Sequence, residues 1–510
     1  MGLKLVRSRC FVSDATIDQI KKHAKQNFPM LFFVRSRGLF IAGIVIIIVT
    51  AWFSVGYHHP DEHFQVWEFA KYKLGESPVG DLPWEYGAQM RPGLQPLMAY
   101  SMVLLSRWVG IMDPFVPVFM LRLMVGFVAF MVYWRWAEVL STTMRDGGYL
   151  LRLGLVFFWM MPYLNVRFSS ENLSAVTFLG GLLFIFPRVE QKSGAILFWG
   201  GFFLSLSFFF RYQIAFAGLG LGAWMMFRRS ITGGQWLNLL MGAMVAMVLG
   251  FLADYWLYGE WVLAPYHYFT QNIVENKAAG FGTSPWWWYF TEMPVLMLPP
   301  LSLFLFWFMG VGVRRYSGHV LVWCLGAFVL GHVLVGHKES RFLFPMLFPM
   351  LCLGALGWDY YSVDKQLPLW LKRVWYGSLV LNGICLVMRC VYPANDTMEY
   401  SKFMRGYSLE HPGSSVYWEK NSDPKIKDLM LNYYQSPWMR VELLDSLVQL
   451  NAVSRPKTGD LVLFKWDRPD FVPRGFELEE VFCQYPEWLL RYNPNDWQGR
   501  TRIWRVYRVR

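Results

Sequence analysis

Two clusters of charged side chains in this sequence could do chemistry, and the first of them is acidic. It reads His58-His59-Pro60-Asp61-Glu62-His63-Phe64-Gln65. Adjacent Asp and Glu side chains point in different directions, so one carboxylate can accept a proton from a substrate hydroxyl while the other pairs with a cation. We interpret Asp61 and Glu62 as a candidate general base and its partner. A structural ion pair that only anchors the loop is the alternative interpretation.

The histidines beside the acidic pair raise the question of a metal site. His58 and His63 are five residues apart, and Pro60 interrupts any helix between them. The sequence therefore lacks the helix-spaced pair of ligands, joined by a third, that is typical of zinc sites. We predict neither a metal ion nor another cofactor.

The second cluster, His337-Lys338-Glu339-Ser340-Arg341, is mainly basic. A carboxylate base and a group of cations on one surface suit a reaction whose leaving group is a phosphate, because cations stabilise the charge that develops on it. The alternative is that Lys338 and Arg341 only extend toward a membrane surface. Including both clusters, the candidate binding residues are His59, Gln65, Glu85, Arg91, Arg167, Arg211, His337, Lys338 and Arg341.

The composition decides which class of protein carries these clusters. Of the 510 residues, 55% are hydrophobic and 16% are charged. These fractions exclude an ordinary soluble enzyme, a disordered chain and a disulfide-stabilised secreted scaffold, which leaves a multi-pass membrane protein. The net charge of +12 could indicate nucleic-acid binding, but residues 1–392 supply +11 of it. We attribute that excess to membrane topology and predict no nucleic-acid partner.

Apolar runs predict eleven transmembrane helices. They lie at 39–57, 115–134, 153–166, 173–187, 194–210, 212–227, 236–253, 293–313, 319–336, 342–358 and 374–388. A further apolar run, 94–112, contains Arg107, and counting it as a span would invert every later loop. If 94–112 is not counted as a span, the loops on the same side of the membrane as the N-terminus hold 20 Lys and Arg residues. The positive-inside rule assigns loops rich in Lys and Arg to the cytoplasmic side. We therefore predict that 94–112 is an interfacial or re-entrant helix.

This topology divides the chain into three parts. Residues 1–38 form a cytoplasmic segment, and residues 39–392 form a transmembrane domain whose first outer loop is 58–113. Residues 393–510, which are nearly neutral, form a small mixed α/β domain on the extracytoplasmic face. Both chemical clusters then lie on that same face.

Two finer expectations follow from local patterns. In the C-terminal domain, 459–464 and 502–507 have the pattern of strands, and 425–451 contains segments with helical periodicity. Within the second span, Arg122 is either functional or packed against a Glu or backbone carbonyl groups, because an intramembrane charge needs a partner.

The two clusters resemble the motifs of a known enzyme family. The acidic run with Glu68, followed by Trp84-Glu85-Tyr86 and Arg91, resembles the first-loop signature of glycosyltransferase family 22. This family of lipid-linked mannosyltransferases belongs to the GT-C class, and the third GPI mannosyltransferase type is the most similar. The run from His337 to Phe342 resembles the family's later outer-loop motif.

The resemblance implies a GT-C-like helical bundle and a reaction. Mannose would pass, with inversion, from a polyprenyl-phosphate donor to a lipid-linked glycan acceptor at the outer or luminal face of a bacterial inner membrane or endoplasmic reticulum membrane. Asp61 would be the base with Glu62 as its partner. His337, Lys338 and Arg341 would lie near the donor phosphate.

Two alternatives remain at the level of the sequence. One is a transporter or lipid flippase that uses Asp61 and Glu62 as a proton or cation site; transporters, however, place such charges near the bilayer midplane. The other is a GT-C transferase for a different sugar.

Overall fold

The computed structural model describes most of the chain. The described residues are 29–187, 189–229, 231–364, 367–395, 397–419, 431–435, 439–445, 450, 456–465, 477–500 and 503–510. Most of the predicted cytoplasmic segment 1–38 lies outside this part, as does Arg502 of the second predicted strand.

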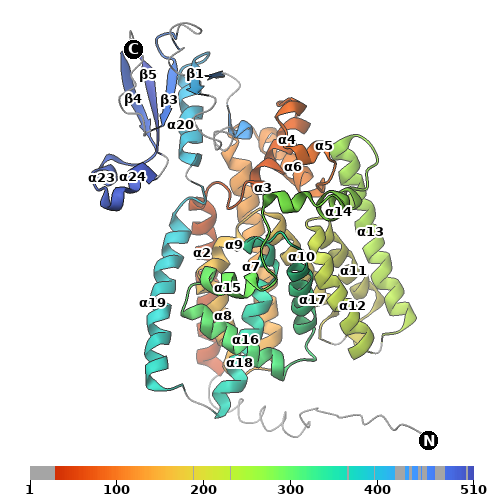
Figure 1. The fold of residues 1–510 in the computed structure, drawn as a ribbon. Helices are drawn as coiled ribbons and strands as arrows, with labels where there is room; N and C mark the ends of the chain where they lie inside the picture. The colour runs from red at the N-terminus through yellow and green to blue at the C-terminus, as the bar shows by residue number, and fades with distance from the viewer. Residues whose placement is uncertain are drawn as a thin grey trace, which may run out of the picture.

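A bundle of helices makes up the larger part of the molecule (Figure 1). Its helices are α2 (Pro29–Phe53), α7 (Phe115–Ser141), α8 (Gly147–Phe157), α9 (Met160–Asn165), α10 (Ser170–Ile185), α11 (Gly194–Phe208), α12 (Ala215–Arg228), α13 (Gly233–Tyr258), α15 (Trp288–Leu296), α16 (Leu301–Arg315), α17 (Val320–Leu334), α18 (Leu347–Asp364) and α19 (Leu369–Val391). Each of the eleven predicted spans overlaps one of these helices or two consecutive ones.

Not all of these helices are long enough to cross a bilayer alone. Among the described residues, five helices are long and apolar enough: α2, α7, α13, α18 with its preceding turn, and α19. The pair α16 and α17, bent by 117° at the break between them, makes a sixth if the two are counted as one span. Helices of the length of α10 or α12 reach only ~21–24 Å at ~1.5 Å per residue, against a hydrocarbon core of ~30 Å. The protein is a helical membrane protein, and eleven spans remain a prediction.

Glycines allow the helices of the bundle to approach closely. A Cβ added at Gly201 of α11 would lie 1.9 Å from the carbonyl oxygen of Leu239 in α13, and one at Gly242 would lie 1.9 Å from that of Phe198. Close backbone contact through small residues is how membrane helices pack, because lipid offers little hydrophobic drive for association.

Short helices of the first outer loop lie at one end of the bundle, the end that also carries the C-terminal domain (Figure 1). They are α3 (Asp61–Phe64), α4 (Trp67–Lys73), α5 (Trp84–Gly87) and α6 (Leu94–Trp108). Helix α6 covers residues 94–108 of the predicted interfacial segment 94–112 and packs against α4, α7 and α13. The backbone N–H of Gly93 donates to the buried Asp254 Oδ1 at 2.7 Å, which ties the start of α6 to α13.

The C-terminal domain packs helix α20 (Thr397–Glu410) on a five-stranded sheet of order β2-β1-β3-β5-β4. The strands are β1 (Ser415–Glu419), β2 (Arg440–Leu444), β3 (Leu461–Lys465), β4 (Leu478–Cys483) and β5 (Trp504–Val509). β1 runs parallel to β2 and β3, and β5 is antiparallel to β3 and β4. Strands β3 and β5 overlap the two predicted strands.

The expected helical structure in 425–451 is wrong for residues Arg440–Leu444, which form β2. Local periodicity favours a helix there, but the segment pairs along its whole length with β1, from Ser415 opposite Arg440 to Glu419 opposite Leu444. Pairing with a distant strand therefore overrides the local pattern. Apart from 431–435, 439–445 and 450, the remainder of 425–451 lies outside the described residues.

The contact between α11 and α13 gives a stability prediction. Replacing Gly201 by Ala places a methyl group against the Leu239 backbone, which cannot move aside as a side chain can. We expect a loss of about 1–3 kcal/mol, typical of overpacking, measured as a lower thermal unfolding midpoint in detergent. Gly222→Ala in α12, where nothing lies within 4 Å, is the matched control and should unfold at or above the wild-type temperature. Equal stability of the two variants would contradict the packing argument.

Candidate active site

A cavity of about 680 Å³ lies where the first outer loop meets the later outer loops. One part of its wall is charged and includes Asp61, Arg91, Arg211 and Arg341. The other part is apolar and aromatic, with Phe208, Phe216, Phe269, Ile273, Phe281 and Phe342. The cavity therefore suits a ligand with a polar head and an apolar body.

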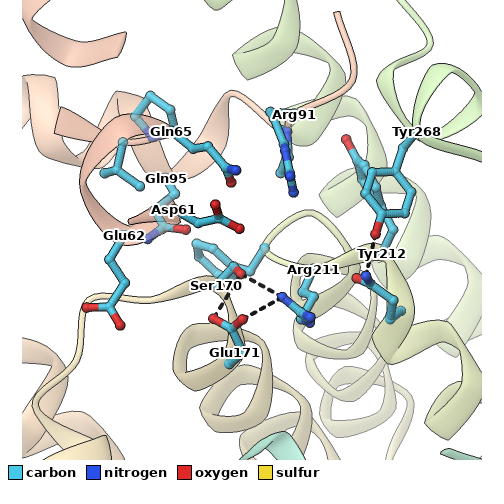
Figure 2. A pocket seen from close by; sticks show the side chains of 15 residues that line it. Asp61, Glu62, Gln65, Arg91, Gln95, Ser170, Glu171, Arg211, Tyr212 and Tyr268 are labelled. Atoms are coloured by element: carbon cyan, nitrogen blue, oxygen red, sulfur yellow. Dashed lines mark hydrogen bonds and ion pairs between the residues drawn. The ribbon is translucent and has the colours of Figure 1, made fainter. Parts of the chain in front are cut away.

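A second, polar pocket of about 40 Å³ adjoins the large cavity (Figure 2). Its lining includes Gln65, Gln95 and Ser170, and it shares Asp61, Arg91, Arg211, Tyr212, Gln213 and Tyr268 with the large cavity. Asp61 is thus in contact with both spaces.

Asp61 opens the single turn of α3, which begins directly after Pro60. Its Oδ2 lies 2.9 Å from Arg341 Nη2, and its Oδ1 lies 3.5 Å from His59 Nδ1. Burial opposes ionisation of this carboxyl, but the Arg341 guanidinium and the His59 hydrogen bond outweigh it and hold the pKa of Asp61 well below its usual range. Asp61 is therefore an ionised carboxylate at neutral pH.

Arg341 contacts three carboxylates at once. Besides Asp61, its Nη1 lies 3.2 Å from Glu171 Oε1 and its Nε lies 2.5 Å from Glu339 Oε2. Glu171 also accepts from Arg211 Nη1 at 2.8 Å, and this pair is almost completely buried. Because Glu171 lies in the first turn of α10, the positive end of the helix dipole also favours its negative charge.

Glu339 joins two histidines of the site, His337 and His59, to this network. Its carboxylate lies 3.0 Å from His337 Nε2 and 3.6 Å from His59 Nε2. Burial alone would raise the pKa of Glu339, but the hydrogen bonds from Arg341 and His337 lower it to about 2. Glu339 is therefore a fixed negative charge that holds Arg341 beside Asp61.

Glu62 points away from Asp61 (Figure 2). Its carboxylate lies 3.9 Å from Arg167 Nη1. Burial raises the pKa of Glu62 to about 7 in spite of Arg167. The two neighbouring carboxyls thus differ: Asp61 carries a full charge at the cavity, while Glu62 is partly protonated near neutral pH.

Arg91 and its neighbours form the opposite side of the polar pocket. Arg91 Nη2 lies 3.2 Å from Glu85 Oε1, which also accepts from Gln65 Nε2 at 3.3 Å. The Arg91 guanidinium lies over the ring of Tyr268, 5.8 Å from its centroid. These contacts bring Gln65, Glu85 and Arg91, three of the candidate binding residues, together beside the two cavities.

Three cations noted in the sequence lie elsewhere. Lys338 Nζ donates to the carbonyl of Val335, and Lys338 is not among the residues that line either cavity. Arg167 donates to the carbonyls of Ser54 and Gly56. Arg122 also donates to Ser54, at 3.1 Å, so its partner is a backbone carbonyl. The two arginines thus satisfy carbonyl groups that follow the end of α2.

Several residues of the site were not predicted. They are Glu171, Glu339, Tyr212, Gln213 and Tyr268. The two glutamates carried a signal, because Glu339 lies within the second charged cluster and Glu171 lies four residues after the candidate Arg167. Tyr268 carried none, since it is one of many aromatic residues in its loop. Within the described residues, no group of three or more His, Cys, Asp or Glu side chains is arranged to hold a metal ion.

Relatives of the chain share parts of its sequence. "Mannosyltransferase APTG1" of Arabidopsis thaliana is 25% identical over 61% of this chain and 56% of its own length. "GPI mannosyltransferase 3" of Yarrowia lipolytica is 24% identical over 66% of this chain and 65% of its own length. The chain thus matches about half to two thirds of the length of these two relatives.

A solved structure and a family model cover more of the chain. The crystal structure of ArnT from Cupriavidus metallidurans, bound to undecaprenyl phosphate, superposes with a TM-score of 0.53 at 12% identity, over 92% of this chain and 97% of that one. This likeness shows that the fold is shared. The model of the Alg9-like mannosyltransferase family matches residues 39–410, which include every residue of the site described above. The chain belongs to the Alg9-like mannosyltransferase family, which bears out the resemblance to glycosyltransferase family 22.

Proposed function

We propose that this protein transfers a mannosyl group from a polyprenyl-phosphate donor to a hydroxyl of a lipid-linked glycan, with inversion at the anomeric carbon. The family supports mannosyl transfer. The observation that carries the proposal is the position of Asp61, an ionised carboxylate that faces both cavities and contacts Arg341. A base at the meeting point of two binding spaces can take a proton from an acceptor in one while the donor occupies the other.

The large cavity suits the donor. Its apolar wall can hold the first part of a polyprenyl chain, and its charged wall carries three arginines that can face a phosphate. Among the described residues, Nε and Nη2 of the buried Arg211 are without a hydrogen-bond partner, and such donors are costly to leave unpaired. Both atoms are closed to solvent in this structure, so a phosphate oxygen would reach them only if the Arg211 side chain turned toward the cavity. The undecaprenyl phosphate bound to the structurally similar ArnT supports a ligand of this class.

The reaction follows from this arrangement. The acceptor hydroxyl transfers its proton to an Oδ of Asp61 while its oxygen attacks the anomeric carbon. The bond between that carbon and the phosphate oxygen breaks, and the electron pair leaves with the phosphate. Arg341 and Arg211 stabilise the departing charge. Attack opposite the leaving group inverts the configuration.

Asp61 rather than Glu62 is the base in this proposal. Glu62 lies 3.9 Å from Arg167 and points away from Arg91 and Arg211 of the large cavity (Figure 2). Its role is to hold the loop through Arg167, which also binds the carbonyl groups after α2.

The membrane geometry completes the proposal. The first-loop helices and the C-terminal domain share one end of the bundle (Figure 1), and the positive-inside rule assigns that end to the extracytoplasmic or luminal side. A transporter would need its charged site near the bilayer midplane, whereas Asp61 lies in a loop helix at the end of the bundle.

Replacing Asp61 by Asn tests the base. The amide keeps the size of the side chain but cannot accept the proton, so we expect kcat to fall by about 10²–10⁴, the usual contribution of a general base. The measurement is transfer from polyprenyl-phosphate mannose to a lipid-linked glycan by purified enzyme in lipid.

Asp113→Asn is the matched control, because Asp113 is exposed in the same outer loop and its Oδ1 accepts from the Phe115 amide, as an Asn oxygen also can. It should retain wild-type turnover. If Asp61→Asn kept the wild-type kcat, Asp61 would not be the general base. Transfer of another sugar but not of mannose by the wild-type enzyme would overturn the proposed donor.

The dependence of the reaction on pH tests the contact between Asp61 and Arg341. In the wild type, Arg341 keeps the pKa of Asp61 low, so the base stays ionised as the pH falls. In Arg341→Gln, burial acts without this counter-charge and the pKa of Asp61 rises. The acid limb of kcat/KM should therefore move to higher pH by at least about one unit, in addition to a loss of kcat.

The control for this pH profile is Arg135→Gln, which removes an exposed guanidinium paired with Glu138 on α7. Its acid limb should coincide with that of the wild type. An unmoved acid limb in Arg341→Gln would show that a group other than Asp61 controls the rate.

A further inference from the structure

The C-terminal domain reaches the back of the helix that carries Asp61. Helix α3 spans Asp61–Phe64, and His63 lies two residues after Asp61. At ~3.6 residues per turn, these two side chains leave the helix about 200° apart. Asp61 faces the cavities, while His63 is 2% exposed and lines neither of them. Any group that fixes the His63 side chain therefore fixes the rotation of α3 about its axis and its position along that axis, and with them the position of Asp61.

A buried pair holds His63 from its own loop. Its Nε2 lies 2.6 Å from Glu68 Oε1, and both side chains are 2% exposed. The same Glu68 oxygen accepts the backbone N–H of Tyr433 at 2.9 Å. An amide from the C-terminal domain thus binds the same carboxylate oxygen of the first outer loop that holds His63.

Tyr434 holds His63 from the other side. Its ring stacks on the imidazole with centroids 5.5 Å apart at 22°, and on Phe115 of α7 at 4.6 Å and 18°. Tyr434 is 2% exposed and also borders the small space that Glu62 and Arg167 line. The ring therefore lies between α3 and a long helix of the bundle, where it sets their separation.

Further contacts keep this turn in place. Tyr433 Oη donates to the carbonyl of Pro114 at 3.2 Å, and Asn432 Nδ2 donates to Asp81 Oδ2 at 3.3 Å. Lys71 Nζ donates to the carbonyl of Asn432. The turn Asn432–Tyr434 is therefore attached to the first outer loop at several points. Both of its tyrosines meet His63 of α3, Tyr433 edge-on with centroids 6.5 Å apart and Tyr434 by stacking.

We propose that Tyr434, acting through the His63–Glu68 pair, is a positioning residue for the general base. This inference rests on the proposed function of Asp61 and extends it to a part of the chain that the family model does not match, since the matched region ends at residue 410. The C-terminal domain, through its Asn432–Tyr434 turn, is then a component of the active site although none of its described residues lines the two cavities.

The test compares substitutions of Tyr434 with a matched one elsewhere in the domain. Tyr434→Leu keeps an apolar side chain but removes the stacked ring, so α3 can shift. We expect kcat to fall at least about tenfold, because small displacements of a catalytic group have large effects, while KM for the donor changes less than about twofold. Tyr434→Phe keeps the ring and should restore kcat.

Tyr417→Leu is the control for general destabilisation. Tyr417 is 4% exposed in β1 and packs against Leu444, Val462 and Val509, away from α3. Its kcat, corrected for folded protein, should match the wild type. Equal losses of kcat in Tyr417→Leu and Tyr434→Leu would mean that the domain contributes only stability and would overturn the proposal, as would wild-type kcat in Tyr434→Leu.

Two further measurements separate this proposal from the proposed function. In Tyr434→Leu the acid limb of kcat/KM should move to higher pH, because Asp61 loses its close contact with Arg341 while Arg91 and His59 remain near it. Hydrogen exchange of the backbone amides at 62–66 should accelerate in Tyr434→Leu and not in Tyr417→Leu, and this needs no substrate. If exchange at 62–66 is the same in Tyr434→Leu as in the wild type, the positioning role is refuted, even if the wild-type enzyme transfers mannose. If exchange is faster in Tyr434→Leu but the wild-type enzyme transfers no mannose, only the proposed function is refuted.

Discussion

One guanidinium surrounded by three carboxylates determines how this site is built. Arg341 contacts Asp61, Glu171 and Glu339, which come from the first outer loop, the start of α10 and the later outer loop. Burying one such charge without partners would cost several kcal/mol, and removing one member of a buried pair typically costs about 3–5 kcal/mol. The three segments are therefore held together by the charge that they share. Positions of the other site residues follow from this arrangement.

The ion pairs alone do not fix the distances between the segments that carry the site; the helices of the bundle do. Arg122 and Arg167 bind the carbonyl groups that follow α2, so the chain leaves that helix in a defined direction toward α3. On the other side, the Gly93 amide on buried Asp254 fixes Arg91 relative to α13. Arg91 and Asp61 can therefore face each other across the polar pocket, although they belong to different short helical segments.

The sequence predicted what depends on local pattern and average charge. The apolar runs that overlap the helices, and the unusual run 94–112, follow from apolar length and the positive-inside rule. Asp61, Arg91, Arg211 and Arg341 were candidates because they are charged residues of the predicted outer loops. Lys338 shows the limit of this reasoning. Lys338 and Arg341 are both cations and lie three residues apart in the same turn, yet Lys338 contacts the Val335 carbonyl and Arg341 contacts Asp61. Strand β2 and the contact of Tyr434 with His63 depend on partners distant in sequence, which no local pattern reveals.

The distribution of exposure around Arg341 explains how a carboxylate with a low pKa can act as a base in the proposed reaction. Glu171 is 5% exposed and is also held by Arg211, whereas Asp61 and Glu339 are 27% and 28% exposed. When a donor phosphate binds Arg341, it becomes a fourth anion, and a more exposed carboxylate has to release part of the guanidinium. Glu339 contacts two histidines and Asp61 only one, so in the proposed reaction Asp61 would be the one that loosens. Its pKa would then rise toward the ordinary value, and the proposed base would become stronger only when the proposed donor is in place.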